Sequence, residues 1–237
     1  MTPVLELSAV IKDYRGLRPL RIEHLVIEPG EQLALLGFDR PSAEVLINLI
    51  TGTTLPDRGG IRVFGHSTAA IQDSTEWMAF VDRIGLVTER AVLLEGLSVV
   101  QNLAIPFSLD IEPPGGEVRS RAVALALEVG LDEAVWDRRV ADLDATSRAK
   151  IRLGRALALD PAVVLFEHPS AGVPRAEIGA LGRGMRAVLE RRGVAAVTLT
   201  ADRDFAAAVA KRVLALDPST GHLAGSGGGW LTRLRRR

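Results

Sequence analysis

Apolar and polar residues follow two different periods along this chain, and segments of the two kinds alternate. Short runs that alternate or are wholly apolar are typical of strands, whereas apolar residues three and four apart are typical of helices. The first pattern predicts strands at residues 4–10, 20–27, 32–36, 61–64, 84–88, 162–166, 195–199 and 213–216. The second predicts helices at residues 43–50, 99–103, 117–129, 147–159, 176–191 and 205–211. Because strands alternate with helices, we expect an α/β fold with a mostly parallel sheet.

The middle of the chain has a different pattern. From about residue 95 to residue 141 helical spacing predominates, interrupted by a Pro- and Gly-rich break at residues 112–116. We interpret residues 95–141 as a helical subdomain within a single domain of residues 1–225. Residues 226–237 form a basic tail that includes Trp230. Such a tail fits either contact with a membrane surface or a frayed terminus, and we favour the second interpretation.

Composition narrows the function classes. The 237 residues carry a formal net charge of zero, which argues against broad attraction to nucleic acid, so we expect no nucleic-acid partner. The absence of cysteine excludes disulfides and thiolate chemistry, and the four histidines show no metal-ligand spacing. No apolar run reaches about 18 residues, and the first residues lack a signal-peptide pattern. We therefore expect a cytoplasmic protein.

One segment, LLGFDRPSAE at residues 35–44, lies where a phosphate-binding loop would join a strand to a helix. The phosphate-loop pattern is Gly, four residues, Gly, Lys and then Ser or Thr. Gly37 fits the first position, but Ser42, Ala43 and Glu44 occupy the other three. Ala43 supplies no cation, and Pro41 removes a backbone donor. The segment therefore has the position of a phosphate loop without its chemistry.

Five segments, in order, resemble the ATPase subunit of ABC transporters: IEPGEQLALLG, LPDRGGIRVFG, IGLVTERAVLLEGLSVVQNLAIP, RLGRALALDPAVVLFEHPSAGV and AKRVLAL. The resemblance covers about residues 5–225. It implies a P-loop NTPase-like ABC ATPase fold, with a mostly parallel core sheet, an N-terminal antiparallel β region and a helical subdomain. It also implies ATP and Mg as ligands, head-to-tail pairing with a second ATPase-like subunit, and docking to a membrane permease, with residues 89–103 as part of the docking surface.

The resemblance also assigns positions of the family's nucleotide site to this chain. The Walker A loop and the adenine-stacking aromatic correspond to Tyr14, Gly37, Phe38, Asp39, Arg40, Pro41, Ser42, Ala43 and Glu44. The Q-loop position corresponds to Glu89, and the signature corresponds to Leu143, Asp144, Ala145, Thr146 and Ser147. Walker B ends in Glu167 and His168. The D-loop position corresponds to Pro174, and the H-loop position to Ala201. These assignments are what the resemblance implies, and in most of them the family's functional residue is missing.

Glu44 changes the electrostatics of the site most. We expect it in the first turn of the helix at residues 43–50, where a carboxylate contributes about 0.3–1 kcal/mol to helix stability. The same charge repels a phosphate: two unit charges about 4 Å apart interact by about 4 kcal/mol at an effective dielectric constant near 20. Glu44 would serve as a magnesium ligand only if phosphate were already bound. We therefore interpret it as a structural charge.

Two further positions have a plain structural interpretation beside the functional one. The carboxylate of Glu89 suits either a magnesium contact or a surface salt bridge with its neighbour Arg90, and we favour the salt bridge. In the signature, Asp144 places negative charge where the partner's γ-phosphate would lie. Alternatively, Asp144 or Thr146 caps a helix that starts near residue 147, and we favour this interpretation.

Three side chains retain part of the family's chemistry. Glu167 keeps a carboxylate that could hold magnesium, and His168 replaces the glutamate that activates water. His168 suits either a general base or a buried, hydrogen-bonded histidine, and we favour the second. Tyr14 suits either stacking on adenine or packing over the sheet edge. Stacking of this kind contributes about 1–3 kcal/mol per base in nucleic-acid binders.

We interpret the chain as an ABC-type subunit that is catalytically degenerate, pairs with a second ATPase-like chain and docks a permease. Two alternatives remain open: an active but unorthodox ATPase that uses Tyr14, Glu167 and His168, and a protein-interaction adaptor. The segment LLEGLSVVQNLAIPFSL is similar to Q-loop segments of transporters that handle lipids or lipoproteins. The sequence leaves open the transported substrate, the direction of transport, homodimer or heterodimer, retention of ATP binding, and natural or engineered loss of the motifs.

Overall fold

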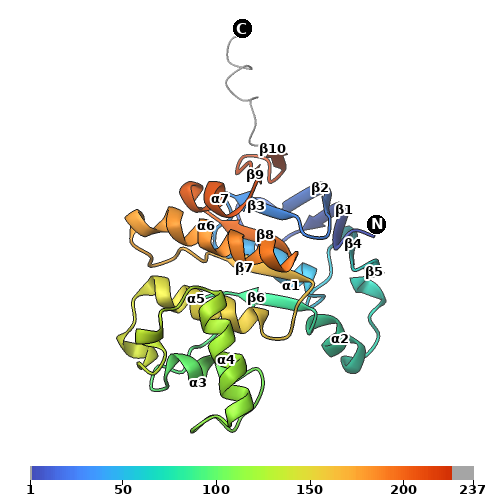
Figure 1. Cartoon of the computed structure of the whole chain (residues 1–237). Coiled ribbons are helices and arrows are strands. Elements are labelled where there is room, and N and C mark those ends of the chain that lie inside the picture. Colours follow the sequence, from blue (N-terminus) through green and yellow to red (C-terminus); the bar gives the residue numbers. More distant parts are fainter. Residues whose placement is uncertain (1, 226–237) are drawn as a thin grey trace.

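The computed structural model describes residues 2–225, which form two sheets and the helices that cover them (Figure 1). The strands are β1 (Leu5–Lys12), β2 (Leu20–Ile27), β3 (Gln32–Leu36), β4 (Arg58–Val63), β5 (His66–Ser67), β6 (Ile84–Val87), β7 (Val163–Glu167), β8 (Ala195–Thr200), β9 (Arg212–Leu216) and β10 (Leu223–Gly225). The α-helices are α1 (Arg40–Ile50), α2 (Ser74–Val81), α3 (Val99–Ala104), α4 (Gly116–Glu128), α5 (Ala145–Leu157), α6 (Arg175–Arg192) and α7 (Arg203–Val209). Single 3-10 turns are η1 (Thr68–Ala70), η2 (Glu133–Val135) and η3 (Val140–Asp142).

The larger sheet has the order β10-β9-β3-β8-β7-β6, and its strands from β9 to β6 run parallel. Only β10 pairs antiparallel within it. The smaller sheet, in the order β2-β1-β4-β5, is antiparallel and is built from the N-terminal strands. The expected α/β architecture, a mostly parallel sheet with an antiparallel N-terminal region, is confirmed.

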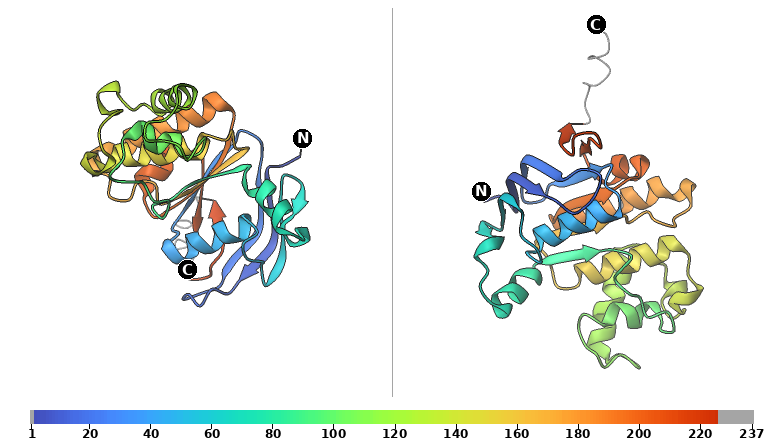
Figure 2. Two further views of the ribbon diagram at one scale, coloured as in Figure 1. Left: turned by 90° about the horizontal axis from the view of Figure 1, so that it is seen from below. Right: turned by 180° about the vertical axis from the view of Figure 1, so that it is seen from behind.

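Helices cover both faces of the parallel sheet. Figures 1 and 2 show α1 on one face and α6 with α7 on the other. Successive side chains of β3 point to opposite faces of the sheet. Leu33 and Leu35 belong to the apolar cluster that includes residues of α1, and Ala34 belongs to the cluster that includes residues of α6 and α7. The sheet is thereby fixed between two apolar layers, and the carboxyl ends of its strands are held in register.

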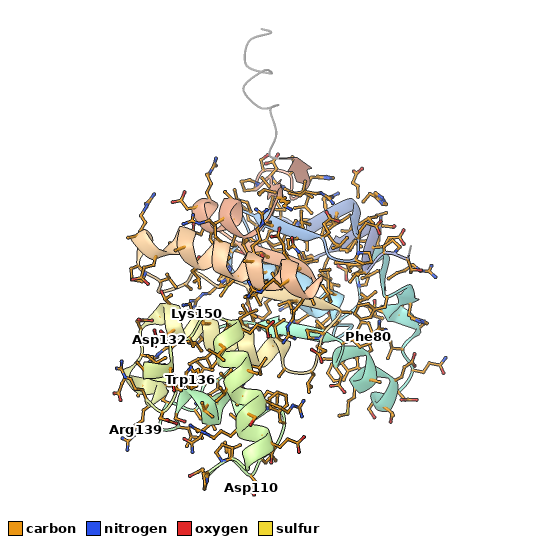
Figure 3. All side chains as sticks on the ribbon, in the orientation of Figure 1. Phe80, Asp110, Asp132, Trp136, Arg139 and Lys150 are labelled. Atoms are coloured by element: carbon orange, nitrogen blue, oxygen red, sulfur yellow. The ribbon has the colours of Figure 1, made fainter. Side chains whose placement is uncertain are left out.

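The helical region of α3, α4 and α5 lies beside the edge strand β6 (Figure 1). Its apolar residues, such as Leu103 and Leu125, belong to the same buried cluster as Phe166 and Met185. Figure 3 labels Trp136 in this region, where its indole N–H donates to the carbonyl of Leu131 at 3.1 Å. The helical region therefore shares its apolar core with one face of the parallel sheet.

The structure differs from the sequence predictions in a few elements. The helix α2 was not predicted; it has eight residues, and none of them is buried. The small strands β5 and β10 were also not predicted. The helix expected at residues 43–50 begins earlier, at Arg40. The basic tail at residues 226–237 lies outside the described residues.

Candidate nucleotide site

The candidate site lies where β3, β6 and β7 end. Parallel strands bring their carboxyl ends to one edge of a sheet, and ligands of open α/β sheets bind outside that edge. The segment 37–39 follows β3, the segment 88–90 follows β6, and Glu167 is the last residue of β7. The fold therefore brings the vestigial Walker A, Q-loop and Walker B positions together.

The segment after β3 turns sharply into α1. Gly37 has φ +89°, and a Cβ there would lie 3.2 Å from the carbonyl oxygen of Leu216. Phe38 is fully buried, and Asp39 is the N-cap of α1. The short turn is thus anchored at both ends by packing and capping.

Asp39 occupies the anion-binding end of α1 with its own carboxylate. Its Oδ1 accepts hydrogen bonds from the backbone N–H of Ser42 at 2.9 Å and from the Ser42 hydroxyl at 2.5 Å. The hydrogen bond from the hydroxyl, followed by that from the N–H, lowers the pKa of Asp39, so the carboxylate is charged at neutral pH. An N-terminal helix end attracts anions through its free N–H groups. Here an internal carboxylate already supplies that anion.

The early start of α1 corrects the expectation for Glu44. Because Asp39 caps the helix and Pro41 suits the first turn, the helix begins at Arg40, and its first turn holds no acidic residue. Glu44 therefore lies in the second turn, so the expected stabilisation by a first-turn charge is wrong. Ala43, at the position of the family's lysine, is fully buried in the apolar cluster beside α1.

The guanidinium of Arg90 fills the centre of the site. Its Nη1 lies 2.5 Å from Oε1 of Glu44, and its Nη2 lies 2.8 Å from Oε2 of Glu167. Its Nε also donates to the same Glu167 oxygen at 3.2 Å. Burial alone would lower the pKa of Arg90, but the hydrogen bond and charge of Glu167, with those of Glu44, raise it. One internal cation therefore joins the Q-loop segment, Walker A helix and Walker B strand.

Glu167 is the buried anchor of this cluster, with 6% of its surface exposed. Besides Arg90, it accepts a hydrogen bond from the Thr88 hydroxyl at 2.6 Å. Arg40, at the start of α1, instead pairs with Glu89 at 2.7 Å. The expected salt bridge of Glu89 is confirmed, but the expected partner is wrong, because Arg90 turns inward to the two other carboxylates.

His168 follows directly after β7 in a left-handed conformation, with φ +46°. Its backbone N–H donates to the carbonyl of Leu199 at 3.0 Å. Its Nε2 is enclosed and has no hydrogen-bond partner within the described part of the chain. The expectation of a hydrogen-bonded histidine is therefore wrong for Nε2. Ala201, at the H-loop position, is exposed and offers no side-chain donor.

The signature positions form a helix start. Asp144 is the N-cap of α5, and its Oδ1 accepts from the N–H of Ser147 at 2.6 Å. This hydrogen bond is the main cause that lowers the pKa of Asp144. Capping by Asp144 is confirmed, whereas Thr146 lies inside the helix and donates its hydroxyl to Glu177. The helix therefore begins at Ala145, slightly before the predicted start.

Tyr14 lies in the loop between β1 and β2 and packs against the apolar cluster beside α1. Its ring covers Gly16, where an added Cβ would come within 2.4 Å of it. Burial, followed by the negative charge of Asp39, raises the pKa of Tyr14. The ring therefore packs against the apolar core, while packing over the sheet edge and stacking on adenine stay predictions.

Residues 2–225 contain neither a cluster of metal-ligating side chains nor a helix that could span a membrane. No group of three or more His, Asp or Glu side chains there is placed to hold a metal ion. No helix there is long and apolar enough to cross a membrane.

With this geometry established, the comparisons with known proteins identify the family. The sequence profile described as ABC transporter matches residues 21–171, well over half of the chain. The chain belongs to the ABC transporter family. The matched segment of this ABC protein includes the positions that correspond to Walker A, the signature and Walker B.

Relatives of this ABC protein include ATP-binding proteins of two kinds. The lipoprotein-releasing system ATP-binding protein LolD of Alcanivorax borkumensis is 27% identical over 210 residues, which cover 87% of this chain and 91% of LolD. The sulfate/thiosulfate import ATP-binding protein CysA of Methylococcus capsulatus is 30% identical over 220 residues. That match covers 90% of this chain but 60% of CysA, so the chain spans less than two thirds of this relative.

Solved ABC structures show the same fold. The chain matches cbiO1 of Clostridium perfringens, described as part of the transporter complex cbiONQ, with a TM-score of 0.79 and 18% identity over 94% of this chain and 87% of cbiO1. It matches the dimeric cassette MJ0796 bound to ADP and Pi with a TM-score of 0.71 and 21% identity, over 92% of this chain and 96% of MJ0796. The expected ABC ATPase fold is confirmed.

Sequence reasoning missed the two residues that complete the site of this ABC protein. Arg90 was considered only as a neighbour of Glu89, and Thr88 was not considered. A signal was present: two carboxylates, Glu44 and Glu167, at positions that the fold brings together need a cation, and an arginine follows the Q-loop position.

Proposed function

We propose that this chain is a catalytically degenerate subunit of an ABC transporter, which keeps the cassette fold without hydrolysing ATP. One observation carries the proposal: side chains of the chain itself supply an anion at the start of α1 and a cation between Glu44 and Glu167. The Asp39 carboxylate accepts the hydrogen bonds at the start of α1, and the Arg90 guanidinium pairs with Glu44 and Glu167.

The chemistry of the remaining residues supports this proposal. A bound triphosphate would compete with Asp39 for the backbone N–H of Ser42 and would lie against the charges of Asp39 and Glu44. Repulsion between unit charges about 4 Å apart is about 4 kcal/mol at an effective dielectric constant near 20. A magnesium ion at Glu167 would lie beside the guanidinium of Arg90, whose two donors hold Oε2 of that carboxylate. The charge network therefore disfavours binding of ATP with Mg.

We further propose that the chain pairs with a second ATPase-like chain and lies at the cytoplasmic face of a membrane through a permease. The family membership supports this assembly, as do relatives that are ATP-binding proteins of a lipoprotein-releasing system and of sulfate/thiosulfate import. We propose residues 95–141 as the helical subdomain and residues 89–103 as part of the docking surface. Since the two relatives differ in direction and substrate, neither transfers a substrate to this chain.

The test of the catalytic proposal is direct. Calorimetry with magnesium and a non-hydrolysable ATP analogue at millimolar concentration should give no binding heat, and the purified chain should release no phosphate above background. LolD, assayed under the same conditions, serves as the positive control. Turnover at ordinary enzyme rates that is abolished by Glu167→Gln or His168→Ala would establish an unorthodox ATPase instead.

The test of the assembly uses membranes of the source cells. The tagged chain, extracted in mild detergent, should co-purify with a protein that has several membrane spans. Recovery of soluble partners alone would support the adaptor interpretation and contradict the proposed place in a transporter.

A further inference from the structure

A pocket of about 440 Å³ lies at the edge of the parallel sheet opposite to the candidate nucleotide site. Three of its lining residues directly precede strands of that sheet: Arg83 before β6, Ala162 before β7 and Val194 before β8. Pockets that hold small molecules measure about 300–1,000 Å³, so this one has the size of a ligand site. None of its lining residues belongs to the charge network around Arg90. The pocket is therefore separate from the nucleotide site.

The walls of this pocket are largely apolar and stiff. Pro3, Pro29 and Pro161 contribute to the lining, together with Val4 and Val194. Because the proline ring fixes φ, these wall segments have little freedom to lose when a ligand binds. The walls therefore suit a rigid apolar body.

One guanidinium group of the pocket is free to bind a ligand. The Cζ atom of Arg83 lies 3.9 Å from the centre of the Phe64 ring, which also lines the pocket. Within residues 2–225 the side chain of Arg83 makes no hydrogen bond and no ion pair. A guanidinium that stacks on an aromatic ring keeps its N–H groups available at its edge, and that planar fork matches a carboxylate. Arg83 therefore presents a fixed, unused anion-binding group.

The aromatic ring beneath this guanidinium is itself held in place. Phe64 has φ +53°, a left-handed conformation that is unusual for a bulky residue. Its backbone N–H donates to the carbonyl of Val4 at 2.9 Å. Its ring meets the edge of Phe80, labelled in Figure 3, with the ring centres 6.1 Å apart. Strained backbone conformations are concentrated at functional sites, which fits a ring that positions a binding group.

The charges around the pocket decide which anion fits. The other arginine of the lining, Arg192, is already engaged: its Nε and Nη2 each donate to an oxygen of Glu128 at 2.6 Å, and its Nη1 donates to Asp160 at 3.0 Å. Asp160 and Asp82 are exposed and adjacent in the chain to lining residues. One free cation between two flanking carboxylates suits a single negative charge. This favours a carboxylate over a phosphate group, which carries nearly two charges at neutral pH.

We propose that this pocket binds a small organic acid, which consists of a single carboxylate on an apolar body. The carboxylate pairs with the guanidinium of Arg83, and the body packs against the proline and valine walls. A neutral molecule of the same shape leaves the guanidinium without a partner, and a cation is repelled by it. The site goes beyond the proposed function, because it requires neither a nucleotide nor a transporter partner.

Titration of the full chain with naphthalene-2-carboxylate, followed by two-dimensional amide NMR, tests the pocket. The amide signals of Gly30 and Gly193, which line it, should shift with a Kd in the millimolar range or tighter, as is typical for a probe of this size. Naphthalene-2-methanol has the same rings without the charge, and acetate has the charge without the rings. Both should bind about 10-fold or more weakly, because a hydrogen bond to a charged group contributes about that factor. The dianion naphthalen-2-yl phosphate should also bind more weakly than the carboxylate.

Two substitutions at the guanidinium extend the test. Arg83→Gln should weaken binding of naphthalene-2-carboxylate by about 10-fold or more. Arg83→Lys should weaken it less, because it keeps the charge but loses the planar fork. Arg139→Gln is the matched control and should leave binding unchanged, because Arg139 is exposed and lies in the helical region, away from the pocket lining (Figure 3).

Each result supports or overturns the proposed pocket. Equal binding of the carboxylate and the alcohol, or tighter binding of the phosphate, would overturn the assignment of a carboxylate ligand. Unchanged binding by Arg83→Gln, or shifts that leave Gly30 and Gly193 unaffected, would overturn the site. The comparison of probes on the wild-type chain decides the matter even if a variant unfolds, which thermal unfolding detects. Turnover of ATP would refute the proposed function and leave this pocket intact.

Discussion

Replacing Arg90 by methionine tests the charge network at the centre of the candidate site. The change removes the guanidinium but keeps a flexible apolar side chain of similar length. It leaves Glu167, whose side chain is 8% exposed, with the Thr88 hydroxyl as its remaining described partner. It also frees Glu44, which points to the same guanidinium. The two carboxylates then lose the cation they share, so we expect the folded state to be destabilised.

The magnitude follows from the solvent exposure of the two ion pairs, Arg90–Glu167 and Arg90–Glu44, which are called the Glu167 arm and the Glu44 arm below. Removing one partner of a fully buried ion pair costs about 3–5 kcal/mol. Because the Arg90 side chain is 48% exposed, water screens the pair, and we reduce the Glu167 arm to about 2 kcal/mol. The Glu44 arm, with both partners about half exposed, adds about 0.2–1 kcal/mol. The sum is about 2–3 kcal/mol, or a fall of about 5–10 °C in Tm for a chain of this length.

Urea unfolding followed by circular dichroism measures this loss, and Arg40→Met provides the control. Arg40 also pairs with a glutamate, but its side chain is 75% exposed, so its loss should stay below about 1 kcal/mol. Combining Arg90→Met with Glu167→Gln should cost less than the sum of the single changes, because both remove the same contact. A loss below about 0.5 kcal/mol for Arg90→Met, or strictly additive effects, would refute the reasoning.

Two further predictions concern stability. Asp144→Ala should cost about 1 kcal/mol by removing the cap of α5, whereas Asp144→Asn should retain most of it. Because the folded-state pKa of Asp144 is lowered, its charge contributes stability that is fully present above the unfolded-state pKa of about 4 and is lost as the pH falls through the folded value. The wild type should therefore lose its advantage over Asp144→Asn as the pH falls below about 4 in urea titrations. An advantage that grows on acidification would contradict this. Gly85→Ala should destabilise the protein by about 1–3 kcal/mol, since the new Cβ would lie 2.6 Å from the Ala156 carbonyl oxygen. Gly184→Ala in α6, where nothing lies within 4 Å of the new Cβ, should stabilise it by up to about 1 kcal/mol. Equal melting temperatures for these two variants would count against the packing argument.

Much of the fold could be predicted because it depends on local patterns. The strands β2 and β3 have the predicted bounds, since their apolar residues are bracketed by turn residues such as Pro29 and Gly30. The helix α2 escaped prediction because its eight residues are fewer than the about 11–18 over which the helical period is recognised, although Trp77, Phe80 and Val81 are spaced as on one helix face. The start of α1 was misplaced because Asp39, which caps the helix, was assigned to the phosphate-loop motif at residues 37–44 and not to a helix cap.

The sequence shows which of the family's site residues are absent, but not which residue of this chain lies at the centre of the site. The missing lysine at Ala43 and the changed signature can be recognised from residue types alone. The role of Arg90 needs the fold as well, because its partners Glu44 and Glu167 lie 46 and 77 residues away in the chain (90 − 44 and 167 − 90). Only a fold that places the two carboxylates together shows that they need a cation. Long-range ion pairs of this kind leave no periodic signal in a sequence.

The shared position of Arg90 also has an evolutionary consequence. Regaining phosphate chemistry by point mutation requires both a lysine at residue 43 and removal of the guanidinium. Ala43→Lys alone brings an ammonium group into an apolar cluster next to an existing cation site, and loss of Arg90 alone leaves two carboxylates facing each other. Each first step lowers stability before any catalytic gain, so, under the proposed function, Arg90 disfavours recovery of hydrolysis by single substitutions and favours roles in which the cassette serves as a fixed part.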